Sequence, residues 1–309
     1  MSVFKRDYLP ENYQNNTMYN LVWAISDLVV RLSVVTHTLR PKVFPGTDDP
    51  YPRNSKINGS GRIIFAKKFR GQCQCPDCLS TGNYVYEWAE IKILTAAHVV
   101  NNYEEVAGTT CEYHFGHFKG TLKGYSLYSV NVEHDRAELI CVTHDMSLVN
   151  AIIGKIYSFR SLDQQAKNMY GPSERKKVFI IVSHPHGYDK HVTFGYRVET
   201  VEIPINNYRR YTYYKYSAKT CGGSSGAPVY FVGKENTWTT HVHKGYHPDG
   251  IGESGTEWEN VDYNFNQRSS ANEGCHSPRV LSNASGCNSI VSELGRGQIF
   301  GAGVAIVQN

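Results

Sequence analysis

Short runs of β-branched and aromatic residues, punctuated by Gly, Asn and Pro, recur from about Ser55 to Gly245. They form two blocks: GSGRIIFAKK, NYVYEWAEIKILTAA and ELICVT come first, and KKVFIIVSHP, HVTFGYRVETVEIPI, YRRYTYYKYSA, GAPVYFV and TTHVHKG follow. A stretch of helix-forming residues from Asn150 to Tyr170 separates the blocks. Many short strands with turn residues between them are typical of sandwiches and barrels. The sequence therefore predicts an all-β fold with two barrel-sized halves.

The segments on either side of the strand-rich region have a different character. We expect residues 1–55 to be an N-terminal helical arm and connector, because apolar residues recur at helical spacing within it, at Leu21, Ile25, Leu28, Val29, Leu32 and Val35. Its apolar face is expected to dock on the chain itself or on a partner. Residues 56–255 form the main domain, with a first barrel over about 56–150 and a second over about 151–255. Residues 256–309 are predicted to be a loop-rich extension with one closing strand in GQIFGAGVAIV.

Charge and hydropathy restrict the partners and the location. The formal charge is +4 and the basic residues are scattered, which does not favour nucleic-acid binding. The most apolar stretch, Leu21 to Val35, contains Asp27 and Arg31, so we predict no membrane span. The first residues lack an apolar core followed by a small-residue cleavage site, which predicts a cytoplasmic protein. Secretion by another route stays open.

Three residues supply the chemistry needed for acyl transfer by serine. That reaction requires a nucleophile, a base that takes its proton, an acidic group that orients the base, and donors for the oxyanion. His98 lies in TAAHVV at the end of an apolar run, Asp135 lies in DRAEL, and Ser225 lies in GSSGAP. The glycines around Ser225 allow backbone amides to turn inward. Any one of these segments alone is weak evidence for a catalytic site, but all three occur together in this chain.

Taken in chain order, TAAH, DRAEL and GSSGAP resemble the motifs of the chymotrypsin-like (trypsin-fold) serine peptidases. The resemblance covers roughly residues 56–250 and implies two six-stranded antiparallel β-barrels with the site between them. It implies that His98 acts as general base and then acid, that Asp135 fixes the tautomer of His98, and that Ser225 attacks the scissile carbonyl. The amides of Gly223 and Ser225 are expected to form the oxyanion hole.

Several segments depart from the digestive trypsins. The activation sequence IVGG is absent, and the first strand reads NGSGRIIFA, which resembles the opening of bacterial-type and intracellular trypsin-like peptidases. The HPHG turn from His184 to Gly187 resembles the second-barrel hairpin of that group. Ser224 stands where an aspartate commonly precedes the nucleophile. We therefore expect no activation by a new N-terminus.

The residues near Ser225 also suggest a substrate preference. Lys219 stands six positions before Ser225, where trypsin-type enzymes have an aspartate. Thr220 and His243 resemble the threonine and histidine with which glutamyl endopeptidases hold an acidic side chain, although His241 is a competing alignment. The hypothesis is cleavage after an acidic residue. The alternative is that Lys219 points to solvent, His243 is structural, and the pocket prefers a neutral side chain.

Three of the eight cysteines are clustered in CQCPDC, as Cys73, Cys75 and Cys78. Thiolates at this spacing can share one tetrahedral zinc ion. Cys111 is the predicted fourth ligand, with His114 or His117 as replacements. Such an ion would brace the first barrel, and catalysis would need no cofactor. Free or disulfide-bonded thiols are the alternative.

The predicted function is that of a serine endopeptidase acting on proteins or peptides through a Ser-His-Asp triad and an acyl-enzyme intermediate. Two alternatives remain from the sequence. One is a catalytically inactive protease-fold binding module, and the other is a zinc-stabilised scaffold recruited through its N-terminal helix.

Overall fold

The structure is a computed structural model that describes residues 4–36, 55–171, 178–206, 209–234, 237–246, 250–255, 257–260 and 304–306. Residues 37–54 of the predicted arm and connector and most of the predicted C-terminal extension lie outside these residues.

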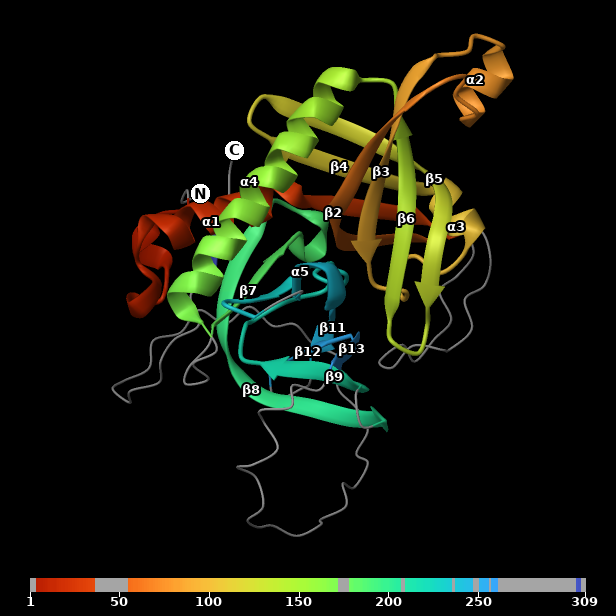
Figure 1. The fold of residues 1–309 in the computed structure, drawn as a ribbon. Helices are drawn as coiled ribbons and strands as arrows, with labels where there is room; N and C mark the ends of the chain where they lie inside the picture. Colours follow the sequence, from red (N-terminus) through yellow and green to blue (C-terminus); the bar gives the residue numbers. More distant parts are fainter. Residues whose placement is uncertain are drawn as a thin grey trace.

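Six antiparallel strands form a closed first barrel in the order β1-β2-β3-β6-β5-β4 (Figure 1). Their bounds are β1 Val29–Val35, β2 Lys56–Arg70, β3 Glu87–Thr95, β4 Thr109–Phe115, β5 Phe118–Asn131 and β6 Arg136–Thr143. Alternate residues of a strand face the same side, and Ala89, Ile91 and Ile93 of β3 accordingly fill the barrel interior with no exposed surface. This burial gives the barrel its core.

The second half of the molecule is a further antiparallel sheet with the strand order β10-β7-β8-β9-β12-β11. The bounds are β7 Val178–Ser183, β8 His191–Asn206, β9 Arg209–Tyr216, β10 Val229–Phe231, β11 His243–Tyr246 and β12 Gly252–Ser254, with β13 Glu257–Asn260 on β9 and β14 Val304–Ile306 on β8. The first and last strands of this order, β10 and β11, also lie next to each other. Pro228 forms a β-bridge with Val242, and the Gly226 amide donates to the His243 carbonyl at 2.8 Å. The predicted all-β fold with two antiparallel halves is confirmed: the first half is a closed six-stranded barrel, and the second is a sheet with six strands on its main path and two more at its side.

One long helix connects the two halves. The helices are η1 Arg6–Tyr8, η2 Glu11–Tyr13, α1 Asn16–Leu28, α2 Pro76–Thr81, α3 Tyr103–Ala107, α4 Met146–Tyr170, η3 Pro185–Gly187 and α5 Thr237–Thr240. Helix α4 starts where the Asp145 carboxylate accepts the Leu148 amide, and α1 starts with the same contact between Asn15 and Met18. Helix α1 packs on α4, and its apolar side chains join the main core.

The N-terminal segment contains the predicted helix, α1, but its end belongs to the first barrel. The helical spacing describes Asn16–Leu28 correctly, but Val29–Val35 form strand β1, which pairs with both β2 and β4. The spacing is ambiguous because Val30, Leu32 and Val34 also alternate, and each is fully buried in the barrel. The segment forms a strand because it can pair with the open edges of both β2 and β4. This pairing provides hydrogen-bond partners for the backbone N–H and C=O groups of β1. The barrel therefore starts at Val29 and not at residue 56.

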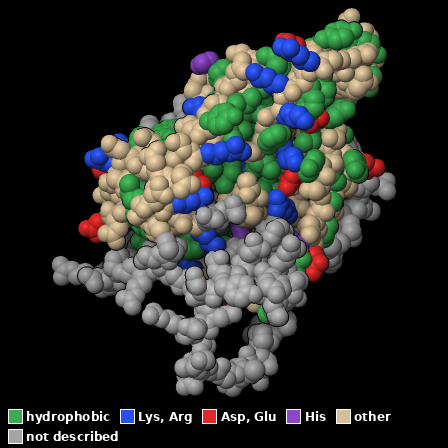
Figure 2. All heavy atoms as spheres, in the orientation of Figure 1, with side chains coloured by type: hydrophobic (Ala, Val, Ile, Leu, Met, Phe, Trp, Pro, Cys, Tyr) green, Lys and Arg blue, Asp and Glu red, His purple; other side chains and the backbone are tan. Residues whose placement is uncertain are grey.

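Two surface properties bear on the expected partners. No helix among the described residues is both long enough and apolar enough to cross a membrane. On the face shown in Figure 2, Lys and Arg side chains are dispersed among acidic, polar and apolar ones.

Candidate active site

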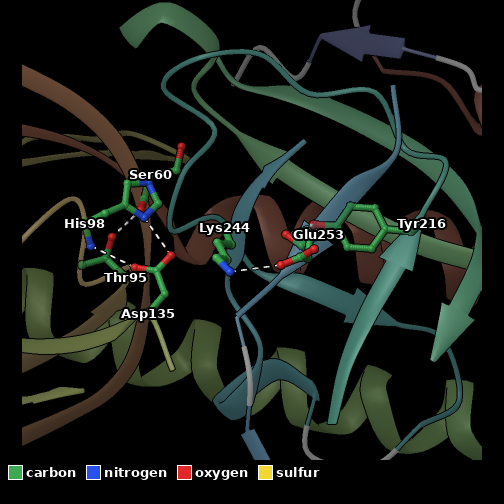
Figure 3. Close-up of polar contacts among 7 residues, drawn as sticks. All are labelled: Ser60, Thr95, His98, Asp135, Tyr216, Lys244 and Glu253. Atoms are coloured by element: carbon green, nitrogen blue, oxygen red, sulfur yellow. Dashed lines mark hydrogen bonds and ion pairs between the residues drawn. The ribbon is translucent and has the colours of Figure 1, made fainter. Parts of the chain in front are cut away.

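His98 and Asp135 meet because the strands that carry them are paired. His98 follows the end of β3, Asp135 directly precedes β6, and the register of these strands sets Thr95 opposite Ala137. The His98 Nδ1 atom lies 2.7 Å from Asp135 Oδ2, and the His98 backbone amide donates to Oδ1 at 2.9 Å (Figure 3). A carboxylate that accepts from Nδ1–H leaves Nε2 as the basic nitrogen of the imidazole. The pair can therefore accept a proton at Nε2.

Asp135 is held rigidly in this position. It is 4% exposed, and its φ of 52° lies in the left-handed region, which aspartate tolerates better than most residues. Both of its carboxylate oxygens are engaged by His98. The carboxylate therefore contacts His98 through both the ring and the backbone.

Ser225 lies in the turn before β10, and packing sets this turn against the end of β3. Gly226 has a φ of +82°, and a Cβ there would lie 2.1 Å from Thr95 Oγ1 and 2.9 Å from the Ala96 nitrogen. The Ser225 carbonyl accepts the Ser60 amide of β2 at 2.8 Å. Only glycine fits at position 226, and its closeness to β3 brings the half-buried Ser225 to the segment that presents His98.

The peptide between Gly222 and Gly223 has a defined orientation. The Gly222 carbonyl accepts the His186 amide of η3 at 2.5 Å, and Gly223 has a φ of +88°. The C=O and N–H of a trans peptide point in opposite directions, so the Gly223 amide points away from His186. Within the described part of the chain, neither the Gly223 nor the Ser225 amide donates a hydrogen bond. Both donors are available to an oxyanion.

Ser60 is a residue of this site that sequence reasoning missed. Its buried hydroxyl donates to the Gly223 carbonyl at 2.9 Å and accepts the His184 amide at 2.9 Å, while its carbonyl accepts the Thr95 hydroxyl at 2.8 Å. It thus links the first barrel to the Gly223 turn and to η3. The GSG opening of β2 was the available signal, but only the structure shows what its hydroxyl contacts.

The predicted pocket residues differ in their surroundings. Lys219 is exposed, whereas the Thr220 hydroxyl is buried and has no hydrogen-bond partner among the described residues. His243 is 2% exposed, and its Nδ1 lies 2.6 Å from the Tyr216 hydroxyl. Burial, with a smaller contribution from the neighbouring His98 and opposed by Asp135, lowers the pKa of His243 to about 3. His243 is therefore neutral and adjoins the His98–Asp135 pair.

His241, the alternative to His243 as a pocket residue, has different surroundings. His241 is 1% exposed, its Nδ1 lies 2.8 Å from the Thr240 hydroxyl, and its Nε2 lies 3.1 Å from the Thr212 carbonyl. Both ring nitrogens are thus occupied within the core. Next to His243, Lys244 pairs with Glu253 at 3.1 Å, which neutralises its charge (Figure 3).

Five of the described cysteines form two separate groups. Cys73, Cys75 and Cys78 lie together, and the fourth side chain beside them is that of His144. The predicted ligand Cys111 is instead buried in the first barrel, with its Sγ 3.7 Å from that of Cys141. The prediction of Cys111 as the fourth ligand is wrong, because its strand β4 adjoins β1 and β5 and not the β2–β3 loop. The alternatives His114, also on β4, and His117, which contacts Phe118, are not part of the group either.

Because His184 and His243 are buried, we expect the stability of the fold to decrease in acid. Burial lowers the pKa of His184 to about 3, with Lys190 adding to the effect, and His243 has the same value. In the unfolded chain, each histidine binds a proton near the ordinary pKa of about 6.5. In the folded chain, both stay neutral until the pH approaches 3. The folded state is therefore most stable relative to the unfolded state above about pH 6.5, and it loses stability as the pH falls towards 3. We expect the free energy of unfolding to fall by up to about 1.4 kcal/mol per pH unit for each histidine.

Urea unfolding between about pH 7 and about pH 4 measures this slope. His243→Gln should reduce this slope, and His117→Gln, which alters a histidine in tilted ring contact with Phe118, serves as the control. An equal slope in the wild type and in His243→Gln would contradict the assignment of His243 as a buried neutral group.

A closed antiparallel barrel beside a second antiparallel sheet is consistent with the trypsin-like fold. Residues 81–233 match the family model for the trypsin-like peptidase domain. The chain therefore contains a trypsin-like peptidase domain and is a serine endopeptidase by class, that is, a hydrolase.

Three solved structures illustrate what the chain is similar to. The active form of the Rv3671c protease from M. tuberculosis is 16% identical with a TM-score of 0.42, and the match covers 80% of this chain and 82% of that one. The HtrA-type protease AlgW with a tripeptide is 14% identical with a TM-score of 0.42, covering 77% and 58% of the two chains. A thermostable serine protease, AL20, from an extremophilic microorganism is 13% identical with a TM-score of 0.39, covering 75% and 92%. No curated protein matches the sequence.

Proposed function

We propose that this chain is an active serine endopeptidase that uses Ser225, His98 and Asp135. The observation that carries the proposal is the His98–Asp135 contact of 2.7 Å, in which the second carboxylate oxygen holds the His98 backbone. This arrangement prepares Nε2 as a base before any substrate arrives. Trypsin-like family membership over residues 81–233 supports the same reading.

In the proposed reaction, the Ser225 hydroxyl attacks the substrate carbonyl while His98 Nε2 takes its proton. The negative charge that develops on the carbonyl oxygen is stabilised by the amides of Gly223 and Ser225, and each such donor contributes about 10²–10³ in turnover. His98 then donates its proton to the leaving amine, and an acyl-enzyme on Ser225 remains. Water, deprotonated by His98, hydrolyses this ester and restores the free enzyme.

Labelling with a fluorophosphonate probe tests the proposal. The folded wild type should be labelled on Ser225, because the probe reacts with an activated serine and its oxyanion mimics the intermediate. Ser225→Ala and His98→Ala should not be labelled. A folded wild type that resists the probe would instead favour the inactive binding module.

We further propose that the pocket prefers an acidic side chain before the scissile bond. The buried, unpartnered hydroxyl of Thr220 is a donor without an acceptor. His243 can donate from Nε2 in the tautomer whose Nδ1 accepts the Tyr216 hydroxyl 2.6 Å away. Neither nearby lysine offers a buried, unpaired positive charge, because Lys219 is exposed and Lys244 is paired with Glu253. The preference would therefore rest on hydrogen bonds.

Cleavage of a peptide library measures this preference. We expect Glu, and less often Asp, before the scissile bond, and Thr220→Val should reduce the preference for Glu over Gln by about tenfold or more, the value of one hydrogen bond to a charged group. Ser217→Ala, which removes a hydroxyl bonded to the Tyr196 amide, is the matched control. A wild-type preference for Arg, Lys or a neutral residue would refute the acidic pocket.

Other parts of the prediction are secondary to this reaction. We propose that hydrolysis requires no cofactor and that any bound zinc is structural. Helix α1 is proposed to serve the fold and not an outside partner, since Met18, Leu21 and Ile25 are buried within the chain. The cytoplasmic location stays a prediction from sequence.

A further inference from the structure

We propose that Cys73, Cys75, Cys78 and His144 bind one structural zinc ion at the outer end of the first barrel. The proposal is independent of the peptidase reaction. The four ligand atoms all lie within 4.8 Å of one another. They come from two places in the chain, the loop between β2 and β3 and the junction between β6 and α4.

The spacing of the ligand atoms fits one tetrahedral ion. His144 Nε2 lies 3.3 Å from the sulfur of Cys73, 3.6 Å from that of Cys78 and 3.7 Å from that of Cys75. An ion bound at the usual Zn–S and Zn–N lengths of about 2.3 and 2.0 Å holds sulfur and nitrogen ligands about 3.5 Å apart. The four side chains therefore already surround a position of the right size.

The chemistry of the donors favours zinc over harder ions. Three thiolates and one imidazole form a soft set, which suits zinc and not magnesium or calcium. Four protein ligands complete a tetrahedron and leave no open position for water, which is the pattern of a structural site. The three cysteines are free thiols, and an odd number of them would leave one thiol unpaired in any disulfide arrangement among themselves. Binding releases the thiol protons to solvent.

Local structure holds the cysteines in place. Cys75 directly precedes α2 and Cys78 lies in its first turn, and the helix is followed by Gly82 with a φ of 68°. The Cys75 amide donates to the Cys73 sulfur at 3.5 Å. Val85, Trp88 and Val142 pack against the three cysteines and shelter the sulfurs from water. His144 is on the exposed side of the group.

The position of the site explains what the ion would do. His144 follows β6 directly, and the register of β3 with β6 sets Ala89 opposite Thr143. His98 and Asp135 lie at the other ends of these two strands. Asp135 and His144 flank the eight residues of β6, so their Cα atoms lie roughly 30 Å apart at about 3.3 Å per residue. Figure 1 shows α2 at the outer end of the barrel, away from the second sheet. The ion would therefore clamp the strands that carry the His–Asp pair without touching substrate.

Metal analysis of the full-length purified protein tests the proposal. We expect about one zinc per chain by mass spectrometry, and X-ray absorption should show zinc with about three sulfur neighbours and one nitrogen neighbour. Removal of the metal should lower the Tm. Protein without zinc, zinc without a sulfur shell, or a disulfide among these cysteines would overturn the proposal.

Variants separate this site from the catalytic one. Cys75→Ser and His144→Ala should lose zinc to a chelator at a concentration that leaves the wild type loaded, and Cys111→Ala should keep it. Zinc loss in Cys111→Ala with retention in His144→Ala would refute the assigned fourth ligand. Ser225→Ala should keep its zinc, so a failure of the peptidase proposal and a failure of the zinc proposal give different results.

Discussion

Replacing Ser225 with alanine is expected to lower kcat by a factor on the order of 10⁶, as for other serine nucleophiles. The His98–Asp135 contact of 2.7 Å would remain, but it would have no hydroxyl to deprotonate. Only the oxyanion donors and substrate binding would then contribute to the rate. Hydrolysis of a peptide substrate measures kcat, and a thermal melt checks that the variant is folded.

The adjacent serine provides the control. Ser224 is fully buried, and its hydroxyl lies 3.0 Å from that of Ser183. Ser224→Ala should therefore cost about 1 kcal/mol of stability through the lost hydrogen bond, with kcat reduced by less than about tenfold. If Ser224→Ala abolished activity and Ser225→Ala retained it, the nucleophile would be misassigned.

Replacing Asp135 with asparagine is expected to lower kcat by about 10⁴. The carboxylate accepts from both the ring Nδ1 and the backbone amide of His98. An amide has a single acceptor oxygen, so it can serve only one of these donors, and its NH₂ group would favour a proton on Nε2 instead. The imidazole would then be in the wrong tautomer to act as a base.

Steady-state kinetics of Asp135→Asn should show the loss in kcat with little change in KM, because the substrate does not contact this buried carboxylate. Asp145→Asn is the matched control, since asparagine can cap α4 as aspartate does. Activity of Asp135→Asn near that of the wild type would show that the contact with His98 is structural only.

Local sequence was sufficient for the elements that depend on neighbours in the chain. Short runs of β-branched and aromatic residues predicted the strands that became β2, β3 and β6, and the helix-forming stretch from Asn150 to Tyr170 became α4, which begins at Met146. His98 and Asp135 could be selected before the structure was known because each lies in a short motif. The cysteine spacing likewise marked three residues that the fold keeps together.

Contacts between distant segments could not be predicted in the same way. Strand β1 has a pattern compatible with helix, and its pairing with β2 and β4 decides its structure. Ser60 bonds to His184 and Gly223, which lie 124 and 163 positions away from it in the sequence. His144 reaches the cysteines only because β3 and β6 are paired.

The sequence by itself determined which residue types are available for acyl transfer and metal binding, because those properties belong to the side chains and their immediate neighbours. Only the tertiary structure decided that Asp135 faces His98, that Gly226 packs on β3, and that His144 replaces Cys111 beside the cysteines. The physical reason is that strand register sets which distant side chains meet, and register depends on burial and pairing of the whole sheet.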